Sequence, residues 1–479
     1  MRNEELLRDI CQKHCAVLGF GVSNRPLVRF LLAHGTKRIT VHDKKSVSEL
    51  GEEALELSAL GVTFVSGESY LDVIDADVIF RSPGIREDVG GIPDAVARGA
   101  LLTSEMELFF ALTPARIIAV TGSDGKTTTT TLISKILGRE LEAKADSRVY
   151  VGGNIGEPLL SYAEGMTERD FAVVELSSFQ LKTMKQSPWR AVITNLAPNH
   201  LDWHTDMAEY IEAKRNICAY PELTLLVTNA ENEITASLAR EQRGKVTLFS
   251  SKISDGASLI AGRQDGCGVY ERDGQICLLD GNGEHPVLRT RDIRLLGRHN
   301  VENYMAAIAA LEGLVSEESI REIAIGFGGV EHRLEFVREL DGVRYINSSI
   351  DSSPSRTTAA LSALSEKPIV ILGGYDKHIP FDGLGRVLCE RAKTVVLTGA
   401  TAPLIAKAIK ASGMEAPPVY LEDDFSAAVY RCRALAQRGD IVLLSPACAS
   451  FDAFPNFEAR GRYFKKIVME MEESANGTV

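Results

Sequence analysis

Residues 116–128 read Arg-Ile-Ile-Ala-Val-Thr-Gly-Ser-Asp-Gly-Lys-Thr-Thr. The apolar, β-branched start of this stretch predicts a buried strand. After the turn, apolar residues recur at helical spacing, at Leu132, Ile133, Ile136 and Leu137. Gly122 and Gly125 allow a tight turn and a close approach to a ligand, and the amides at a helix N-terminus attract an anion. The stretch therefore predicts a strand–loop–helix unit that binds the phosphates of a nucleotide.

Two side chains in the turn favour a nucleotide as the ligand. Lys126 would add a positive charge beside the β- and γ-phosphates, and Thr127 would offer its hydroxyl to Mg²⁺. The match to the general phosphate-loop pattern is incomplete, because Val120 stands where that pattern has its first glycine. The alternative is a structural glycine turn with an exposed lysine, which leaves the run of threonines at 127–131 unexplained.

The composition limits the class of protein. The chain has 479 residues, enough for roughly two to four domains. Lys and Arg number 53 and Asp and Glu number 65, giving a formal net charge of −12, so we expect no nucleic-acid binding. The eight cysteines are scattered without a CxxC pair, which indicates reduced thiols. The sequence has no recognisable leader and no apolar run of membrane-spanning length, so we expect a cytoplasmic protein without membrane binding.

Short β-branched runs alternate with helical patterns along most of the chain. Such runs predict buried strands of parallel sheets, and hence an α/β, doubly wound fold. We expect three domains: a Rossmann-like domain at 1–104, a phosphate-loop ATPase-like domain at 105–329 and a second Rossmann-like domain at 330–479. Segment 250–290 is rich in Gly and Asp, with short alternating stretches that predict a small antiparallel excursion.

Polar residues follow two predicted strands of the second block. Glu175 ends the strand at 171–175, at the sheet edge where α/β proteins bind ligands, and a nucleotide-bound Mg²⁺ takes one or two carboxylates. The alternative is a solvated strand-end glutamate. His200 follows the next strand and could be a metal ligand, a general base or a loop histidine. Lys214 lies in a helical pattern, and its spacing alone does not distinguish it from a solvated lysine.

Four motifs, in this order, resemble those of the Mur ligases, the ATP-dependent ligases that build the peptidoglycan stem peptide. They are Thr121-Gly-Ser-Asp-Gly-Lys-Thr127, Glu175-Leu-Ser-Ser-Phe-Gln-Leu181, Asn199-His-Leu-Asp202 and Gly297-Arg-His-Asn300. Segments 372–377, 444–452 and 456–461 are similar to those of the members that add D-glutamate. The phosphate loop alone would not separate this family from the folylpolyglutamate synthases. The resemblance covers essentially the whole chain.

The resemblance implies a division of work among the three domains. The first would bind a UDP-sugar, the second ATP, and the third would close over ATP and the incoming amino acid. The substrates would be UDP-N-acetylmuramoyl-L-alanine, D-glutamate and ATP. In such ligases the carboxylate of the first substrate attacks the γ-phosphate to form an acyl phosphate, and the amine of the second substrate then displaces phosphate.

The resemblance also implies roles for particular residues. Thr127 and Glu175 would serve one Mg²⁺ and His200 a second, which Lys214, carried as a carbamate, would help to place. The catalytic residues would be Lys126, His200 and Lys214. The ATP-binding residues would be Gly122, Ser123, Asp124, Gly125, Lys126, Thr127, Thr128, Asn300, Asn303 and Arg333. The substrate-binding residues would be Ser23, Asp43, Ser82, Pro83 and Gly84 for uridine diphosphate, Asn154, Ser177 and Gln180 in the second domain, and Lys377, Ser450 and Phe457 for D-glutamate.

Asn300 and Asn303 illustrate how far the residues alone lead. They lie three apart in a helical pattern and so share a face, where paired amides would suit an adenine edge. Without the resemblance, two polar residues on a solvated face are an equal alternative.

One motif departs from the family's pattern. The family has approximately Asn-Asp-Ser-Lys-Ala-Thr-Asn where this chain has Asn347-Ser-Ser-Ile-Asp-Ser-Ser353. Ser348 stands in place of the acid expected to hold the ATP ribose, and Ile350 in place of the basic residue. We hypothesise that Asp351 replaces the acid from a shifted position and that Arg356 restores the charge.

Other classes of function stay open on the sequence alone. A nicotinamide oxidoreductase could use the turn at 19–21, although Asn24 stands in place of the third glycine of the dinucleotide motif. A catalytically silent nucleotide-binding regulator would fit the altered motif at 347–353. Among ligases, the alternative is a relative that adds a different amino acid. No coiled coil or interface motif is evident, so we expect a monomer.

Overall fold

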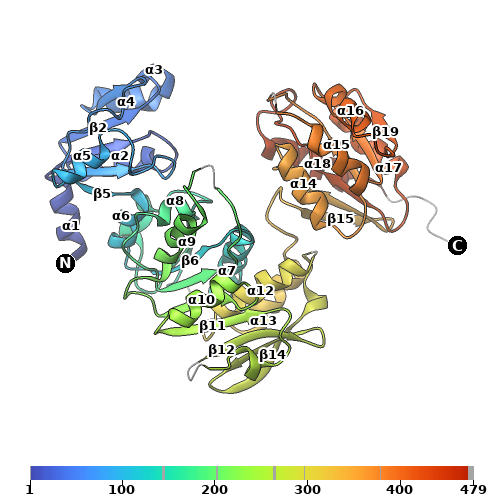
Figure 1. Ribbon diagram of the computed structural model, residues 1–479, viewed down its shortest axis with the longest axis horizontal. Coiled ribbons are helices and arrows are strands. Elements are labelled where there is room, and N and C mark those ends of the chain that lie inside the picture. Colours follow the sequence, from blue (N-terminus) through green and yellow to red (C-terminus); the bar gives the residue numbers. More distant parts are fainter. Residues whose placement is uncertain are drawn as a thin grey trace. The chain divides into compact units, whose positions relative to one another are not determined.

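The computed structural model describes residues 2–142, 146–200, 203–262, 266–295, 297–377 and 379–472. The chain forms two compact units, Met1–Asp292 with His299–Ile323 and Ile293–Arg298 with Ala324–Val479. Helices and sheets alternate throughout both units (Figure 1). Within the described ranges, no helix has both the length and the apolar character that crossing a bilayer requires.

The first unit opens with a five-stranded parallel sheet in the order β3-β2-β1-β4-β5. The central strands β1 and β4 are buried on both faces, because helices cover both sides of a parallel sheet. The strands are β1 (His14–Leu18), β2 (Arg38–Asp43), β3 (Thr63–Ser66), β4 (Val78–Arg81) and β5 (Leu101–Thr103). The helices are α1 (Arg2–Cys11), α2 (Asn24–Ala33), α3 (Val47–Leu50), α4 (Glu52–Ala59), α5 (Ile92–Ala97) and α6 (Glu105–Leu112).

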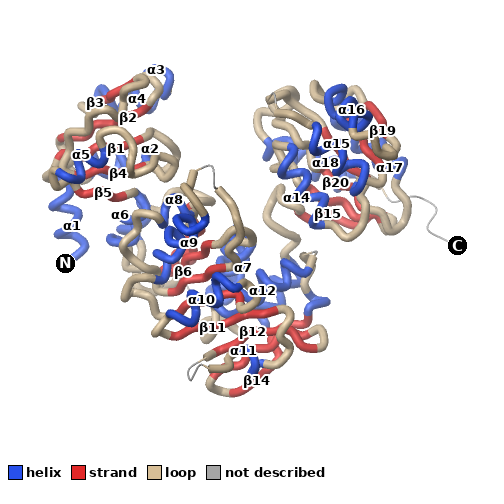
Figure 2. The backbone as a smooth tube through the Cα atoms, viewed as in Figure 1, coloured by secondary structure: helices blue, strands red, loops and turns tan. Residues whose placement is uncertain are grey.

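A nine-stranded mixed sheet follows in the same unit, in the order β14-β13-β12-β11-β10-β9-β6-β8-β7 (strands red in Figure 2). Its strands are β6 (Arg116–Thr121), β7 (Val149–Gly153), β8 (Phe171–Glu175), β9 (Arg190–Ile193), β10 (Leu225–Asn229), β11 (Lys245–Ser250), β12 (Cys267–Arg272), β13 (Gln275–Asp280) and β14 (Gly283–Arg289). The connecting helices are α7 (Lys126–Leu141), α8 (Ser178–Leu181), α9 (Met207–Arg215), α10 (Glu233–Glu241) and α11 (Gly256–Leu259), with short 3₁₀ turns at Leu160–Gly165 and Asn216–Cys218. After β14 come a 3₁₀ turn at Thr290–Asp292 and the helices α12 (Arg298–Ala310) and α13 (Glu317–Gly326).

Two features of this sheet bear on the predictions. Strands β12, β13 and β14 pair antiparallel, which confirms the excursion expected within 250–290. Strand β6 lies between β9 and β8, and all three run parallel. The chain leaves β6 toward one side of the sheet and returns later to the other side. The loop after β6 therefore opens at a topological switch point, where parallel sheets bind ligands.

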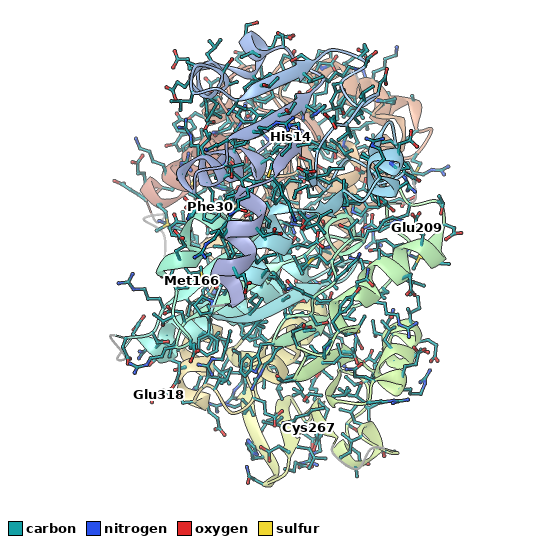
Figure 3. The ribbon with its side chains drawn as sticks, turned by 90° about the vertical axis from the view of Figure 1, so that its left-hand side faces the viewer. His14, Phe30, Met166, Glu209, Cys267 and Glu318 are labelled. Atoms are coloured by element: carbon teal, nitrogen blue, oxygen red, sulfur yellow. The ribbon has the colours of Figure 1, made fainter. Side chains whose placement is uncertain are left out.

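The two sheets of the first unit share one hydrophobic core. Phe30 of α2 and Met166, which precedes β8, belong to the same buried cluster, and Figure 3 labels both. Arg81, fully buried at the end of β4, donates from Nη2 to Phe179 O of α8 at 2.9 Å. The loop that follows β4 is therefore fixed against the larger sheet.

The second unit contains a six-stranded sheet in the order β15-β16-β20-β17-β18-β19, parallel except for the β15–β16 pair. Hydrophobic cores cover both of its faces. The strands are β15 (Glu335–Leu340), β16 (Val343–Asn347), β17 (Ile369–Leu372), β18 (Thr394–Leu397), β19 (Val419–Leu421) and β20 (Ile441–Leu444). The helices are α14 (Pro354–Ala363), α15 (Asp382–Arg391), α16 (Ala402–Ala411), α17 (Phe425–Leu435) and α18 (Phe457–Glu470). The predicted α/β class with three sheets is confirmed, while the exact boundaries at 104/105 and 329/330 stay predictions.

Candidate active site

The phosphate turn requires glycine at two positions, because of the backbone conformation there and because neighbouring atoms leave no room for a side chain. Gly122 (φ 148°) and Gly125 (φ 76°) adopt backbone conformations that L side chains rarely adopt. A Cβ on Gly122 would lie 1.9 Å from Thr194 Oγ1, and a Cβ on Gly125 would lie 2.4 Å from Asn303 Oδ1. No other residue fits either position without moving a neighbour.

The end of β9 holds this turn in place. Asn195 accepts hydrogen bonds from the Ser123 amide through its carbonyl (2.8 Å) and from the Asp124 amide through Oδ1 (2.9 Å). Thr194 Oγ1 donates to Asp124 O at 2.6 Å. Hydrogen bonds within the protein thus fix the conformation of the turn. Sequence reasoning assigned no role to Thr194 or Asn195, although a polar pair at the end of a predicted strand was the available signal.

Lys126 and Thr127 open α7 beside a buried carboxylate. Lys126 Nζ donates to Ser123 O at 2.9 Å, which places its charge over the turn. Thr127 Oγ1 donates to Glu175 Oε2 at 2.7 Å, and Asn154 Nδ2 donates to Glu175 Oε1 at 2.8 Å. Glu175 is only 1% exposed, so the alternative of a solvated glutamate is wrong. The site therefore presents the hard oxygen donors that Mg²⁺ prefers.

Lys214 lies next to the same turn from the side of α9. It is 2% exposed, and its Nζ donates to Thr121 Oγ1 (3.0 Å) and Gly122 O (3.1 Å). Burial lowers the pKa of Lys214 well below its ordinary value, and the charge of Lys126 lowers it further, against a smaller opposing effect of Glu175. Lys214 is therefore not the solvated lysine that its spacing allowed.

His200 follows β9, the strand beside β6, on the loop that leads to α9. Its backbone is left-handed (φ 54°), and its exposed ring lies 5.0 Å from the Phe179 ring, centroid to centroid. The next two residues of its motif, Leu201 and Asp202, lie outside the described residues. The chain resumes at Trp203, whose amide donates to His200 O at 3.1 Å.

Among the residues that the structure describes, no three His, Cys, Asp or Glu side chains converge as a metal cluster. A nucleotide-bound Mg²⁺ needs no such cluster, because phosphate oxygens and water complete its coordination. The donors beside the turn therefore fit magnesium bound together with a nucleotide.

Comparisons with known proteins agree with this geometry. Family models match three segments: the MurD N-terminal domain at residues 14–90, the Mur ligase middle domain at 120–311 and the Mur ligase glutamate ligase domain at 332–448. The UDP-N-acetylmuramoylalanine–D-glutamate ligase of Clostridium novyi (strain NT) is 48% identical over 467 residues, which cover 96% of this chain and 97% of that protein. The chain belongs to the Mur ligase family. The ligase of the same name from Ruminiclostridium cellulolyticum (strain ATCC 35319) is 45% identical, with 98% of this chain and 99% of that protein covered.

Solved structures of Mur ligases support the fold. A structure of UDP-N-acetylmuramoyl-L-alanyl-D-glutamate–2,6-diaminopimelate ligase matches with a TM-score of 0.53 at 19% identity, covering 90% of this chain and 93% of that one. At this identity the likeness concerns the fold alone.

Residues of two further Mur ligase motifs form hydrogen bonds within the first unit. Ser177 and Gln180 form a capping box at the start of α8, in which Gln180 Oε1 accepts from the Ser177 amide at 2.9 Å. Asn303 is buried on α12, accepts from Thr129 Oγ1 (3.3 Å) and donates to Asn300 Oδ1 (3.0 Å). The two asparagines thus lie next to the phosphate turn, and their contact with adenine stays a prediction.

The predicted uridine diphosphate residues converge at the carboxyl ends of β1, β2 and β4. Asn24 Nδ2 donates to Leu18 O (3.1 Å), Gly19 O (2.8 Å) and Ser82 Oγ (3.0 Å). Asp43 Oδ2 accepts from the Phe20 amide at 2.7 Å. The residue that replaced the third glycine of the dinucleotide motif therefore ties the first turn to the loop of Ser82, Pro83 and Gly84, and Ser23 immediately precedes it.

In the second unit, the altered motif 347–353 lies at the end of β16. Asp351 is buried and accepts from Ser445 Oγ at 2.7 Å, and burial raises its pKa to about 6. Arg356 Nη1 donates to Ile350 O at 3.1 Å. Asp351 and Arg356 therefore support the fold of this motif, and their contact with ATP stays a hypothesis.

Arg460 joins the segment at 347–353 to the segment at 444–452, and sequence reasoning gave it no role. It is 2% exposed on α18 and donates to Ser349 Oγ and O, Cys448 O and Ala449 O at 2.9–3.1 Å. These acceptors flank Ser450, which is itself buried. The signal in the sequence was an arginine within the motif at 456–461.

The remaining predicted residues of the second unit occupy loops and one helix start. Lys377 is exposed after β17, and Phe457 begins α18 with its carbonyl accepting from Ser349 Oγ at 2.8 Å. The Arg333 amide donates to Val330 O at 3.0 Å in the segment before β15. Their roles toward D-glutamate and ATP stay predictions.

Proposed function

We propose that this chain joins D-glutamate to UDP-N-acetylmuramoyl-L-alanine at the cost of one ATP. The observation that carries the proposal is that relatives 45–48% identical over nearly the whole chain share one name, UDP-N-acetylmuramoylalanine–D-glutamate ligase. The ordered phosphate turn, with Lys126 over it and Glu175 beside it, supports ATP as the energy source.

The proposed reaction has two steps. A carboxylate oxygen of the UDP-sugar substrate attacks the γ-phosphorus of ATP, and ADP leaves, so an acyl phosphate forms. The deprotonated amine of D-glutamate then attacks the acyl carbon, and phosphate leaves from the tetrahedral intermediate, so an amide forms. Both reactants of the first step are anions, and the site must supply positive charge and fix their geometry. Lys126 and the N-terminus of α7 supply that charge.

We propose that two magnesium ions bind at this site. Thr127 and Glu175 would hold one, and His200 the other. When bound, magnesium supplies positive charge that offsets the repulsion between carboxylate and phosphate. Lys214 would carry a carbamate, formed when its neutral amine adds to CO₂ and releases a proton. The burial and the lowered pKa of Lys214 support this modification.

The substrates are assigned to the three domains as follows. The uridine diphosphate would bind at the turn of Ser23 with Asp43 and residues 82–84, and the muramoyl part near Asn154, Ser177 and Gln180. ATP would contact residues 122–128, Asn300 and Asn303, with Arg333 reaching the γ-phosphate. D-Glutamate would bind Lys377, Ser450 and Phe457. We propose that the enzyme acts as a monomer, which light scattering would test.

Phosphate release with different amino acids tests the proposal. UDP-N-acetylmuramoyl-L-alanine, ATP and magnesium are supplied with L-alanine, D-glutamate or meso-diaminopimelate in separate reactions. We expect release only with D-glutamate, together with the product amide by mass spectrometry. Release with another amino acid would reassign the substrate, and no release with any of them would leave a nucleotide-binding regulator as the function.

A further inference from the structure

The loop after β4 is bonded to the loop that carries His200. Arg86 Nη1 donates to Trp203 O at 2.6 Å, and its guanidinium carbon lies 5.1 Å from the centroid of the Trp203 ring. In return, Trp203 Nε1 donates to Gly84 O at 3.2 Å. Gly84 belongs to the proposed uridine diphosphate loop, so two hydrogen bonds of opposite direction join that loop to Trp203.

Glu209 on α9 (labelled in Figure 3) completes this connection. Its Oε1 accepts from Arg86 Nη2 at 3.2 Å and also from Lys182 Nζ. Its Oε2 accepts from Thr205 Oγ1 at 2.9 Å and from the Thr205 amide. The side chains of Arg86 and Glu209 are 20% and 16% exposed, so solvent screens their attraction less than that of a surface pair.

The connection ends at the backbone of His200. The amides of Trp203 and His204 both donate to His200 O, at 3.1 and 2.9 Å, and close a turn in which His200 is left-handed. A left-handed non-glycine backbone persists only where its surroundings enforce it. Arg86 and Glu209 fix Trp203 and Thr205, the residues on the far side of this turn.

We propose that Arg86 and Glu209 are positioning residues that couple the uridine diphosphate loop to the His200 turn. Binding of the nucleotide sugar at residues 82–84 would restrain Trp203 through Gly84 and Arg86, and would thereby hold His200 where the metal is needed. This inference rests on the proposed function, since it uses the assigned roles of both loops. If these contacts were only structural, replacing them would change the free energy of unfolding without changing the response to UDP or the magnesium dependence.

Trp203 itself reports on this coupling. The chain has two tryptophans, and Trp189→Phe leaves Trp203 as the only one while keeping an aromatic ring beside Arg116 and Arg190. In that background UDP, added without metal, should shift or quench the Trp203 emission. Arg86→Gln should remove most of the response, because only the hydrogen bond from Trp203 Nε1 to Gly84 O remains, while calorimetry shows UDP affinity within about threefold of the parent. Arg86→Lys keeps the charge but loses the fork geometry, and should also lose most of the response.

Magnesium dependence gives the second measurement, with native tryptophans. Arg86→Gln and Glu209→Gln should raise the Mg²⁺ concentration for half-maximal phosphate release by about tenfold, the low end of the effect of orienting residues around a metal ligand. The KM for D-glutamate should not change, because its proposed residues lie in the other unit. Arg240→Gln, which removes an exposed ion pair with Glu233, is the matched control and should change neither quantity.

The outcomes separate this inference from the function on which it rests. Variants that melt like the wild type, keep the UDP response and keep the magnesium dependence would overturn the coupling. A wild type that releases no phosphate with D-glutamate would instead overturn the proposed function. If Arg86→Gln failed to fold, Arg86→Lys and Glu209→Gln would decide the matter by the same two measurements.

Discussion

Replacing Gly122 by alanine should disable the phosphate turn through two separate effects. The new side chain would have to adopt φ 148°, which costs about 1–3 kcal/mol. Its Cβ would also lie 1.9 Å from Thr194 Oγ1. Thr194 can yield only by giving up its bonds to Asp124 O (2.6 Å) and Thr121 O (3.3 Å), each worth about 0.5–1.5 kcal/mol. The two effects together amount to roughly 2–6 kcal/mol.

The helix that follows the turn, α7, offers a control of opposite sign. Gly138 lies inside α7, and a Cβ there meets nothing within 4 Å. Gly138→Ala should therefore stabilise the protein by about 0.5–1 kcal/mol, through helix propensity alone. Urea unfolding and the KM for ATP, measured on both variants, give the comparison. Gly122→Ala should lose stability and raise the KM for ATP at least tenfold, whereas Gly138→Ala should leave the KM unchanged.

A second variant separates the clash from the strain. In Gly122→Ala combined with Thr194→Ala the 1.9 Å contact disappears, and the closest contact to residue 194 becomes its Cβ at 3.2 Å. The double variant should be at least 1 kcal/mol more stable than the sum of the single effects predicts, because each single variant loses the Thr194 hydrogen bonds and the double variant loses them only once. If Gly122→Ala behaved like Gly138→Ala, or if the two substitutions were additive, this account of the turn would be refuted.

Three shorter predictions concern other charged groups of the site. Lys126→Ala should lower kcat by about 10²–10³, and near-normal turnover would contradict its place over the phosphates. His200→Ala should raise the magnesium requirement, and an unaltered titration would count against its role as a ligand. Asp351→Asn tests a pH effect, because burial raises the pKa of Asp351 from 3.8 to about 6. When a carboxyl has a higher pKa in the folded than in the unfolded state, the free energy of unfolding falls as the pH rises between these two values, here by roughly 3 kcal/mol in total. In urea unfolding, the free energy of unfolding of the asparagine variant should therefore exceed that of the wild type at pH 8 but not at pH 4. An equal difference at both pH values would contradict the prediction.

The parts of the site that are local in sequence could be predicted from it. The phosphate turn needs glycine at 122 and 125 for reasons that act within a few residues, and a strand before it and a helix after it were evident from apolar spacing. Glu175 could be predicted because the carboxyl end of a parallel strand has a fixed place in such sheets. The antiparallel strands near 250–290 were predictable from their alternation alone.

What could not be predicted depends on packing between distant segments. Lys214 is unremarkable in its helix, and its pKa is lowered only because folding buries it beside Thr121, 93 positions earlier. Asn195 and Asn303 likewise gain their roles only when the turn lies against them.

The left-handed residues show the same limit in the backbone. Of the non-glycine residues with positive φ in the described chain, His200, His332, Leu334 and Ala447 lie in or next to the predicted site motifs. The identity of an alanine or a leucine gives no indication of such a conformation, and that of a histidine gives only a weak one, because tertiary contacts enforce it. For His200 those contacts come through Trp203 from Arg86 and Glu209. A substitution far from His200 in sequence is therefore expected to act, through this backbone turn, on the affinity for the magnesium proposed to bind there more than on the fold.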